Sequence, residues 1–185
     1  MRNAVDGKTY TVEEYIRFEW QSERRHEFIN GKLFEMPGEK DINNQIAGLI
    51  YILLINFLKD KGYQLYNHDV KVAVPGEKKF YYPDVFATKE ERSTRNQYIK
   101  YEPEIIVEVV SETTQVTDYV DKYIDYTKIP SLTYYIIAEP ETTLITVYEK
   151  EETGNWIARK FTNHEDVITL VKTGMEFKVK NIYKG

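Results

Sequence analysis

Hydrophobic and polar positions follow two different periods along the chain. From about Asn43 to Lys61, apolar residues recur at three- and four-residue steps, which predicts a long helix with a broad buried face. An S/T-x-x-E capping box at Thr11–Glu14 predicts a shorter helix that ends near Ser22. Residues 115–128 have the pattern of a third helix.

Patterns typical of strands occupy most of the remaining chain. Glu27–Glu35 contains two extended runs around Asn30-Gly31, a pair that accepts the positive φ angles of a hairpin turn. Glu104–Val110 is nearly continuous in β-branched residues, which predicts a central strand covered on both faces. Further strands are predicted at Tyr63–Val74, Tyr82–Ala87, Thr133–Ala138, Leu144–Tyr148, Trp156–Phe161 and Met175–Val179. Together these elements predict an α/β (α+β) fold, in which the last three strands form a peripheral antiparallel extension.

Length and composition limit the class of protein. A chain of 185 residues with 42% hydrophobic and 30% charged residues predicts one globular domain spanning residues 1–185. The N-terminus has no signal-peptide core, and the longest apolar run, Ile46–Leu58, is too short to span a bilayer. We therefore expect a cytoplasmic protein without a membrane partner.

Charge and cysteine content narrow the chemistry further. The chain has no cysteine, which excludes disulfides and thiolate zinc sites. Its net charge of −5 argues against binding nucleic acid with the whole surface, but leaves a local basic groove open.

Glu108 is the most informative residue. It lies in the middle of the run Ile105–Val110, where a core strand is expected. A buried, unpaired carboxylate costs several kcal/mol, so it needs a cation, a partner or a proton. A structural salt bridge would satisfy Glu108 equally well.

A second carboxylate, Asp84, follows Pro83 in a similar apolar setting. Two carboxylates on neighbouring strands would repel one another unless a divalent cation lies between them. Carboxylate oxygens suit Mg²⁺ or Mn²⁺ better than zinc, and the three scattered histidines, at 26, 68 and 164, do not form a recognisable ligand set. We therefore predict that Asp84 and Glu108 bind Mg²⁺ or Mn²⁺.

Several short motifs, taken in order, resemble a known family. They are Arg25–Gly31, Tyr82–Val85, Val107–Ser111, the set Asp118, Lys122 and Tyr126, and Ile129–Leu132. Their order and spacing are similar to those of the Uma2-like family (DUF820) of restriction-endonuclease-type proteins in the PD-(D/E)XK nuclease superfamily. The resemblance implies a mixed central β-sheet flanked by helices, a divalent cation, and hydrolysis of phosphodiester bonds in DNA. By analogy with the superfamily, it also suggests a homodimer, because two sites related by a two-fold axis can cut both strands.

One position departs from the superfamily pattern. The lysine of D/E-x-K should lie two residues after Glu108, but that residue is Val110. Lys122 is the candidate replacement, because Asp118, Lys122 and Tyr126 lie four residues apart and share one helix face. Lys122 would orient the attacking water, stabilise the oxyanion or act as the general base, and Tyr126 would position Lys122 or a phosphate oxygen.

Glu27 completes the predicted catalytic set, because nucleases of this type often use an early acidic residue. The alternative for Glu27 is an exposed charge beside the hairpin.

Two rival functions also remain at this stage: a catalytically lapsed module with the nuclease fold that binds nucleic acid or protein, and a tyrosine-rich structural scaffold. The scaffold reading predicts that Glu108 is paired to an Arg or Lys and binds no metal.

Overall fold

The computed structural model describes residues 4–36, 38, 40–92, 97–110 and 116–183, with the first three residues of the last range described by their backbone alone. Its centre is a mixed sheet of six strands in the order β11-β10-β9-β8-β6-β3. β8 and β9 run parallel, and their other neighbours run antiparallel. The strands are β3 (Gln64–Asn67), β6 (Val85–Thr88), β8 (Pro103–Val109), β9 (Tyr134–Glu139), β10 (Leu144–Lys150) and β11 (Trp156–Phe161).

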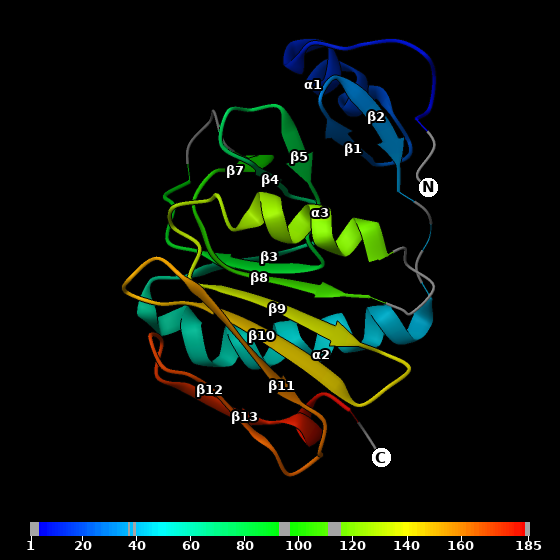
Figure 1. The fold of residues 1–185 in the computed structure, drawn as a ribbon. Helices are drawn as coiled ribbons and strands as arrows, with labels where there is room; N and C mark the ends of the chain where they lie inside the picture. The colour runs from blue at the N-terminus through cyan, green and yellow to red at the C-terminus, as the bar shows by residue number, and fades with distance from the viewer. Residues whose placement is uncertain (1–3, 37, 39, 93–96, 111–115, 184–185) are drawn as a thin grey trace.

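Two helices cover the two faces of this sheet (Figure 1). α2 (Asp41–Leu58) buries Ile46, Ile50 and Leu54 against one face. α3 (Val116–Tyr126) lies over the other face and contributes Tyr126 to a second core cluster. Because side chains alternate along a strand, Ile105 of β8 faces the α2 layer, whereas the even-numbered residues of β8 face α3. The expected central strand, covered on both faces, is therefore confirmed.

A second, five-stranded sheet has the order β2-β1-β5-β4-β7 and lies beside the α3 layer. Its strands are β1 (His26–Ile29), β2 (Lys32–Glu35), β4 (Lys71–Ala73), β5 (Lys79–Tyr81) and β7 (Ile99–Lys100). The β1–β2 hairpin turns at Asn30 (φ 50°) and Gly31 (φ 83°), as the Asn-Gly pair predicts. α1 (Val12–Gln21) packs on this sheet through Tyr15, whose ring stacks on Phe28.

The sequence pattern was wrong about residues 63–74. These residues form two strands in different sheets, β3 and β4, instead of one strand. The break comes at His68, whose φ of 49° lies in the left-handed region and turns the chain from one sheet to the other. Lys71, in β4, is buried in the second sheet.

Two smaller differences have local causes. β6 begins only at Val85, because Pro83 lacks the N–H group that a ladder needs. A further strand, β12 (Val167–Leu170), pairs with β13 (Met175–Lys178) in a hairpin that joins the core on the α2 side. The sequence pattern did not predict β12.

α2 begins five residues before the apolar run Ile46–Leu58, which by itself was expected to be too short to span a bilayer. By length and composition alone, residues 41–61 would also pass as a membrane-spanning helix. In the folded chain, however, the buried side of α2 packs on the sheet as a core helix.

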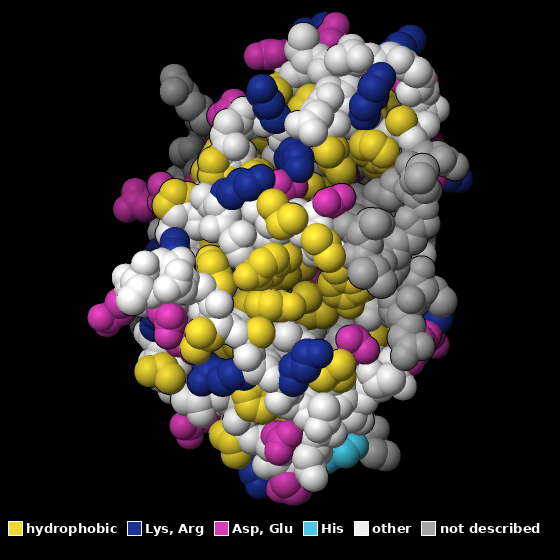
Figure 2. Space-filling model, viewed as in Figure 1, with side chains coloured by type: hydrophobic (Ala, Val, Ile, Leu, Met, Phe, Trp, Pro, Cys, Tyr) yellow, Lys and Arg dark blue, Asp and Glu magenta, His cyan; other side chains and the backbone are white. Residues whose placement is uncertain are grey.

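Hydrophobic side chains also reach the surface on the α3 side. Figure 2 shows them gathered across the middle of the face, over α3 and the neighbouring strands. Val120 and Ile124 of α3 are both about half exposed.

Candidate active site

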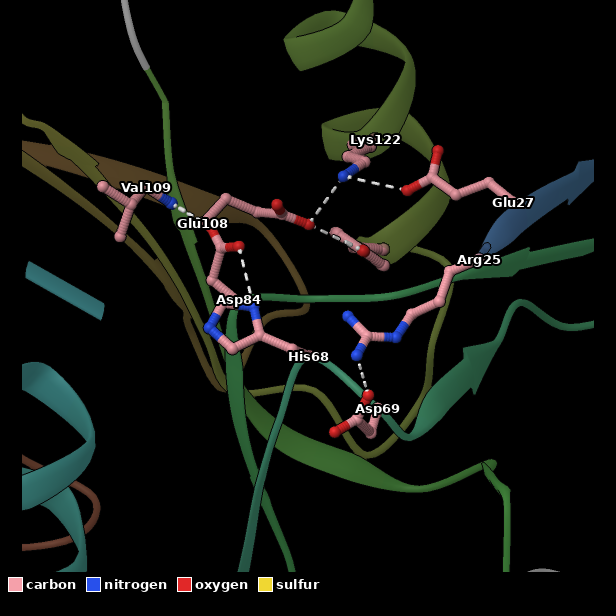
Figure 3. A network of polar contacts seen from close by, with 9 residues as sticks. Arg25, Glu27, His68, Asp69, Asp84, Glu108, Val109 and Lys122 are labelled. Atoms are coloured by element: carbon pink, nitrogen blue, oxygen red, sulfur yellow. Dashed lines mark hydrogen bonds and ion pairs between the residues drawn. The ribbon is translucent and has the colours of Figure 1, made fainter. Parts of the chain in front are cut away.

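The two predicted metal-binding carboxylates lie on neighbouring strands. Asp84 directly precedes β6, and Glu108 lies in β8, where Val85 pairs with Val107. The backbone N–H of Val109 donates a hydrogen bond of 2.6 Å to Asp84 Oδ2, which fixes the Asp84 carboxylate against β8 (Figure 3). Asp84 is 4% exposed and Glu108 5% exposed, so both residues are buried.

α3 brings Lys122 and Tyr126 to Glu108. Lys122 Nζ lies 3.0 Å from Glu108 Oε1, and the Tyr126 hydroxyl donates a 2.9 Å hydrogen bond to the same oxygen. The two residues are one helical turn apart, so both point from α3 toward the sheet. The helix therefore holds one side of the Glu108 carboxylate.

Glu27 joins the same group from the other sheet. Its carboxylate lies 3.2 Å from Lys122 Nζ, and Glu27 is only 2% exposed. The alternative of an exposed charge at Glu27 is therefore wrong. Lys122 bridges Glu27 of β1 and Glu108 of β8, and so links the two sheets (Figure 3).

Burial keeps the surrounding tyrosines in their phenol form. Burial raises the pKa of Tyr126 well above its usual value, and the nearby Glu108 raises it further. The pKa of Tyr135 is raised in the same way, first by burial and then by Glu108. Tyr126 therefore remains a hydrogen-bond donor to Glu108. Since its side chain is fully buried, it contacts Glu108 and has no exposed surface for a phosphate oxygen.

The surroundings of Val110 explain why no lysine stands there. Val110 is 8% exposed and belongs to the apolar cluster between the sheet and α3. An ammonium at this position would lie among hydrophobic side chains, whereas Lys122 enters from the helix above the strand.

Comparison with known proteins identifies the family. The sequence profile of the Uma2 family, described as "Putative restriction endonuclease", matches residues 12–180. The chain belongs to the Uma2 family. Two Synechocystis proteins are similar to this Uma2 chain. "Uncharacterized protein slr1290" is 28% identical over 174 residues, covering 94% of this chain and 90% of its own length. "Uncharacterized protein sll1609" is 26% identical over 152 residues, covering 81% and 86%.

A solved structure shares the fold. The crystal structure of a "putative nuclease belonging to DUF820" from Anabaena variabilis superposes with a TM-score of 0.76 at 13% identity. The match covers 93% of this chain and 96% of the other. The Uma2 chain therefore has the restriction-endonuclease-like architecture that its motifs predicted.

His68 was not predicted as part of the site. Its Nδ1 lies 3.7 Å from Asp84 Oδ1, and its side chain is 20% exposed. The sequence offered no signal for this contact, because it depends on the turn at His68 that carries the Uma2 chain from β3 to β4. Asp118, in contrast, was singled out in the sequence, but its side chain lies outside the described residues.

The donor set suits a hard divalent cation. Both contacts of Glu108 with described residues are made by Oε1, which leaves Oε2 for another ligand. Within the described part of the chain, no three His, Cys, Asp or Glu side chains form a metal-binding group. Two carboxylates supplemented by water and substrate oxygens are typical of Mg²⁺, whereas structural zinc sites have four protein ligands. The Uma2 site thus fits Mg²⁺ or Mn²⁺ at Asp84 and Glu108.

Charge balance favours the same cation. Glu27, Asp84 and Glu108 carry three formal negative charges, and Lys122 carries one positive charge, so the four side chains sum to −2. Excess charge of one sign is costly away from bulk water. A divalent cation would neutralise it.

Proposed function

We propose that this Uma2 protein is an endonuclease that hydrolyses phosphodiester bonds in DNA with Mg²⁺ or Mn²⁺ bound at Asp84 and Glu108. The observation that carries the proposal is the convergence of Glu27, Asp84, Glu108 and Lys122 at one buried place in the fold. Isolated ion pairs are common in proteins, but a lysine held between two buried acids, with a third buried acid on the neighbouring strand, supports a metal-dependent phosphoryl-transfer site.

Each residue has a role that follows from its contacts. The bound cation would polarise the scissile phosphate and lower the pKa of a coordinated water. Tyr126 and Lys122 hold Glu108 Oε1, so Glu108 would bind the cation through Oε2. The Val109 N–H holds Asp84 through Oδ2.

Lys122 lies between Glu27 and Glu108, and we assign it to the attacking water or the developing oxyanion. Glu27 positions Lys122, because its carboxylate is 3.2 Å from the ammonium on the side away from Glu108. The alternative role of Lys122, as the general base, would require it to act as a neutral amine. Contact with two carboxylates supports the electrostatic role.

The test is cleavage of supercoiled plasmid DNA by purified protein with Mg²⁺ or Mn²⁺. We expect Asp84→Asn and Glu108→Gln each to remove activity while the protein remains folded, and Lys122→Ala to slow cleavage. Glu176→Gln is the matched control, because Glu176 is an exposed carboxylate of β13. Full activity in both Asp84→Asn and Glu108→Gln would refute the mechanism.

The same experiment separates the enzyme from its two rivals. A lapsed nuclease module would bind DNA without cutting it under any metal condition. A structural scaffold would contain the Glu108–Lys122 ion pair seen here and show neither cleavage nor a response to Mn²⁺.

We also propose that the protein is cytoplasmic and that it acts as a homodimer. Two copies related by a two-fold axis would place two sites to cut both strands of a duplex. Light scattering of the purified protein in the presence of DNA tests the homodimer, and a monomer in complex with one duplex would contradict it.

A further inference from the structure

A pocket of about 480 Å³ opens beside the active site, between α1 and the five-stranded sheet. Its volume falls within the roughly 300–1,000 Å³ of typical ligand sites. The residues that line it are Glu19, Trp20, Ser22, Glu23, Arg24, Arg25, Asp69, Lys71, Tyr82 and Tyr98. They combine cations with aromatic rings.

Lys71 is the unusual member of this lining. It is 5% exposed, yet no hydrogen bond or ion pair joins its ammonium to any described residue. Its Nζ lies 5.0 Å from the ring centre of Tyr82 and 5.8 Å from that of Tyr15. Burial lowers the pKa of Lys71, and the charge of Glu19 opposes that shift. An ammonium that lines a pocket and has no acceptor among the described residues suits an anionic ligand.

The nearest acids already have partners. Glu19 accepts hydrogen bonds from the Tyr82 hydroxyl at 2.7 Å and from the backbone N–H of His26 at 2.9 Å. Asp69 is ion-paired with Arg25 at the rim (Figure 3). The third acid of the lining, Glu23, is exposed, so an incoming phosphate would meet Lys71 in the buried part of the pocket.

The aromatic side of the pocket is exposed. Trp20 is 71% exposed and Tyr98 53% exposed, and their ring centres lie 6.0 Å apart at an interplanar angle of 66°. An exposed tryptophan on a helix that otherwise packs on a sheet has no role in the core. Flat rings beside cations are the usual means of stacking unpaired bases.

The pocket and the active site draw residues from the same three segments of the chain. Arg25 is two residues from Glu27, and Tyr82 is two residues from Asp84. Asp69 follows His68, which contacts Asp84. Two residues of extended chain span about 6.6 Å, so a strand bound at Asp84 passes within reach of this pocket.

We propose that this pocket holds an unpaired nucleotide of the DNA strand being cut, with its phosphate on Lys71 and its base against Trp20 and Tyr98. The inference rests on the proposed nuclease function, which it deepens by naming a single-stranded segment of the substrate next to the scissile bond.

The experiment uses the fluorescence of Trp20. Trp156→Phe leaves Trp20 as the sole tryptophan, and EDTA prevents cleavage. We expect a twelve-residue oligothymidylate to quench this fluorescence, and a blunt duplex of equal length to leave it unchanged. Lys71→Met should weaken oligothymidylate binding at least tenfold, measured by polarisation of a labelled strand in the protein that keeps both tryptophans. Lys160→Met, which removes an exposed lysine of β11, is the matched control.

Three results would overturn the proposal: no quenching by oligothymidylate, equal loss of affinity in Lys71→Met and Lys160→Met, or equal quenching by thymidine monophosphate at the same concentration. The last would indicate a site for free nucleotides. Because binding is read without metal, the two proposals fail separately. If the protein cleaves DNA but oligothymidylate does not quench Trp20, the pocket proposal is refuted and the nuclease proposal stands. If oligothymidylate binds through Lys71 but no DNA is cleaved, the nuclease proposal is refuted and the pocket proposal stands.

Discussion

Charged side chains in this protein are held by neighbours on other elements. Glu108 illustrates this, because a single oxygen contacts both Lys122 and Tyr126 of α3. The tyrosine contributes a neutral donor that remains protonated, since burial raises its pKa. The lysine contributes the charge. The two contacts are therefore separable by substitution.

Tyr126→Phe tests the neutral contact. We expect a loss of about 1.5–3 kcal/mol in the free energy of unfolding, the range for a hydrogen bond to a charged group, together with slower cleavage. Urea unfolding and plasmid cleavage measure the two effects. Tyr123→Phe is a matched control on α3, because Tyr123 packs against Tyr148 and Tyr135 at the edge of the core. Equal stability of wild type and Tyr126→Phe would show that the bond is dispensable.

Asp125, beside the site on α3, gives a pH-dependent contribution to stability. Burial alone would raise the pKa of Asp125, but hydrogen bonds from Lys79, Lys128 and Tyr81 outweigh it and lower the pKa below its usual 3.8. The Lys79 Nζ–Asp125 Oδ2 distance is 2.5 Å, and the Tyr81 hydroxyl donates at 2.7 Å.

Because the folded pKa is the lower one, Asp125 contributes stability above pH 3.8, and this contribution is lost as the pH falls through the folded value. We expect Asp125→Asn to be less stable than wild type at pH 7, with the difference shrinking below about pH 4. Urea unfolding at a series of pH values measures the difference. A difference that stays constant down to pH 3 would contradict this linkage.

At the scale of elements, α2 shows how one helix serves as core and surface at once. Its inward face contacts the sheet, and Ile50 is 3% exposed there. Ile52, two residues further along, is 53% exposed. The same type of side chain is thus buried at one position and exposed at another within one turn of α2.

Alanine at each position measures the difference. Ile50→Ala should cost about 2–5 kcal/mol, because it removes buried methyl groups and leaves a cavity. Ile52→Ala should change stability by no more than about 0.5 kcal/mol. Equal losses in urea unfolding would mean that α2 does not pack as described.

At the scale of the whole molecule, the site is assembled from both sheets and α3. Glu27 comes from the five-stranded sheet, Asp84 and Glu108 from the six-stranded sheet, and Lys122 from the helix between them. The site therefore exists only in the folded state, so a cation bound there stabilises the native molecule as a whole.

Mn²⁺ should accordingly raise the melting temperature. At a concentration one hundred times its dissociation constant, a ligand adds about 2.7 kcal/mol to the free energy of unfolding. For a chain of this length, that corresponds to an increase of about 5–11 °C in the melting temperature. Asp84→Asn and Glu108→Gln should lose the increase, and Glu176→Gln should keep it. Scanning calorimetry with Mn²⁺ and with EDTA provides the measurement. An increase in all three variants would place the cation elsewhere.

Local sequence patterns predicted most of the elements and pointed to the residues able to carry chemistry. The period of α2, the Asn30-Gly31 turn and the β-branched run around Glu108 are local patterns, and each was confirmed because local sequence decides helix, turn and buried strand. Glu108 was conspicuous because a charge in an apolar run needs a partner. The order of the motifs then indicated the family, which the match over residues 12–180 shows.

Tertiary structure decided which distant residues meet. His68 beside Asp84, and Lys71 buried without an acceptor, both depend on the turn at His68 that sends the chain into a second sheet. The contact between Lys122 and Glu27 joins residues from different sheets of the fold. The physical reason is that hydrophobic period fixes which side of an element is buried, whereas the partner across the core depends on how the elements pack together.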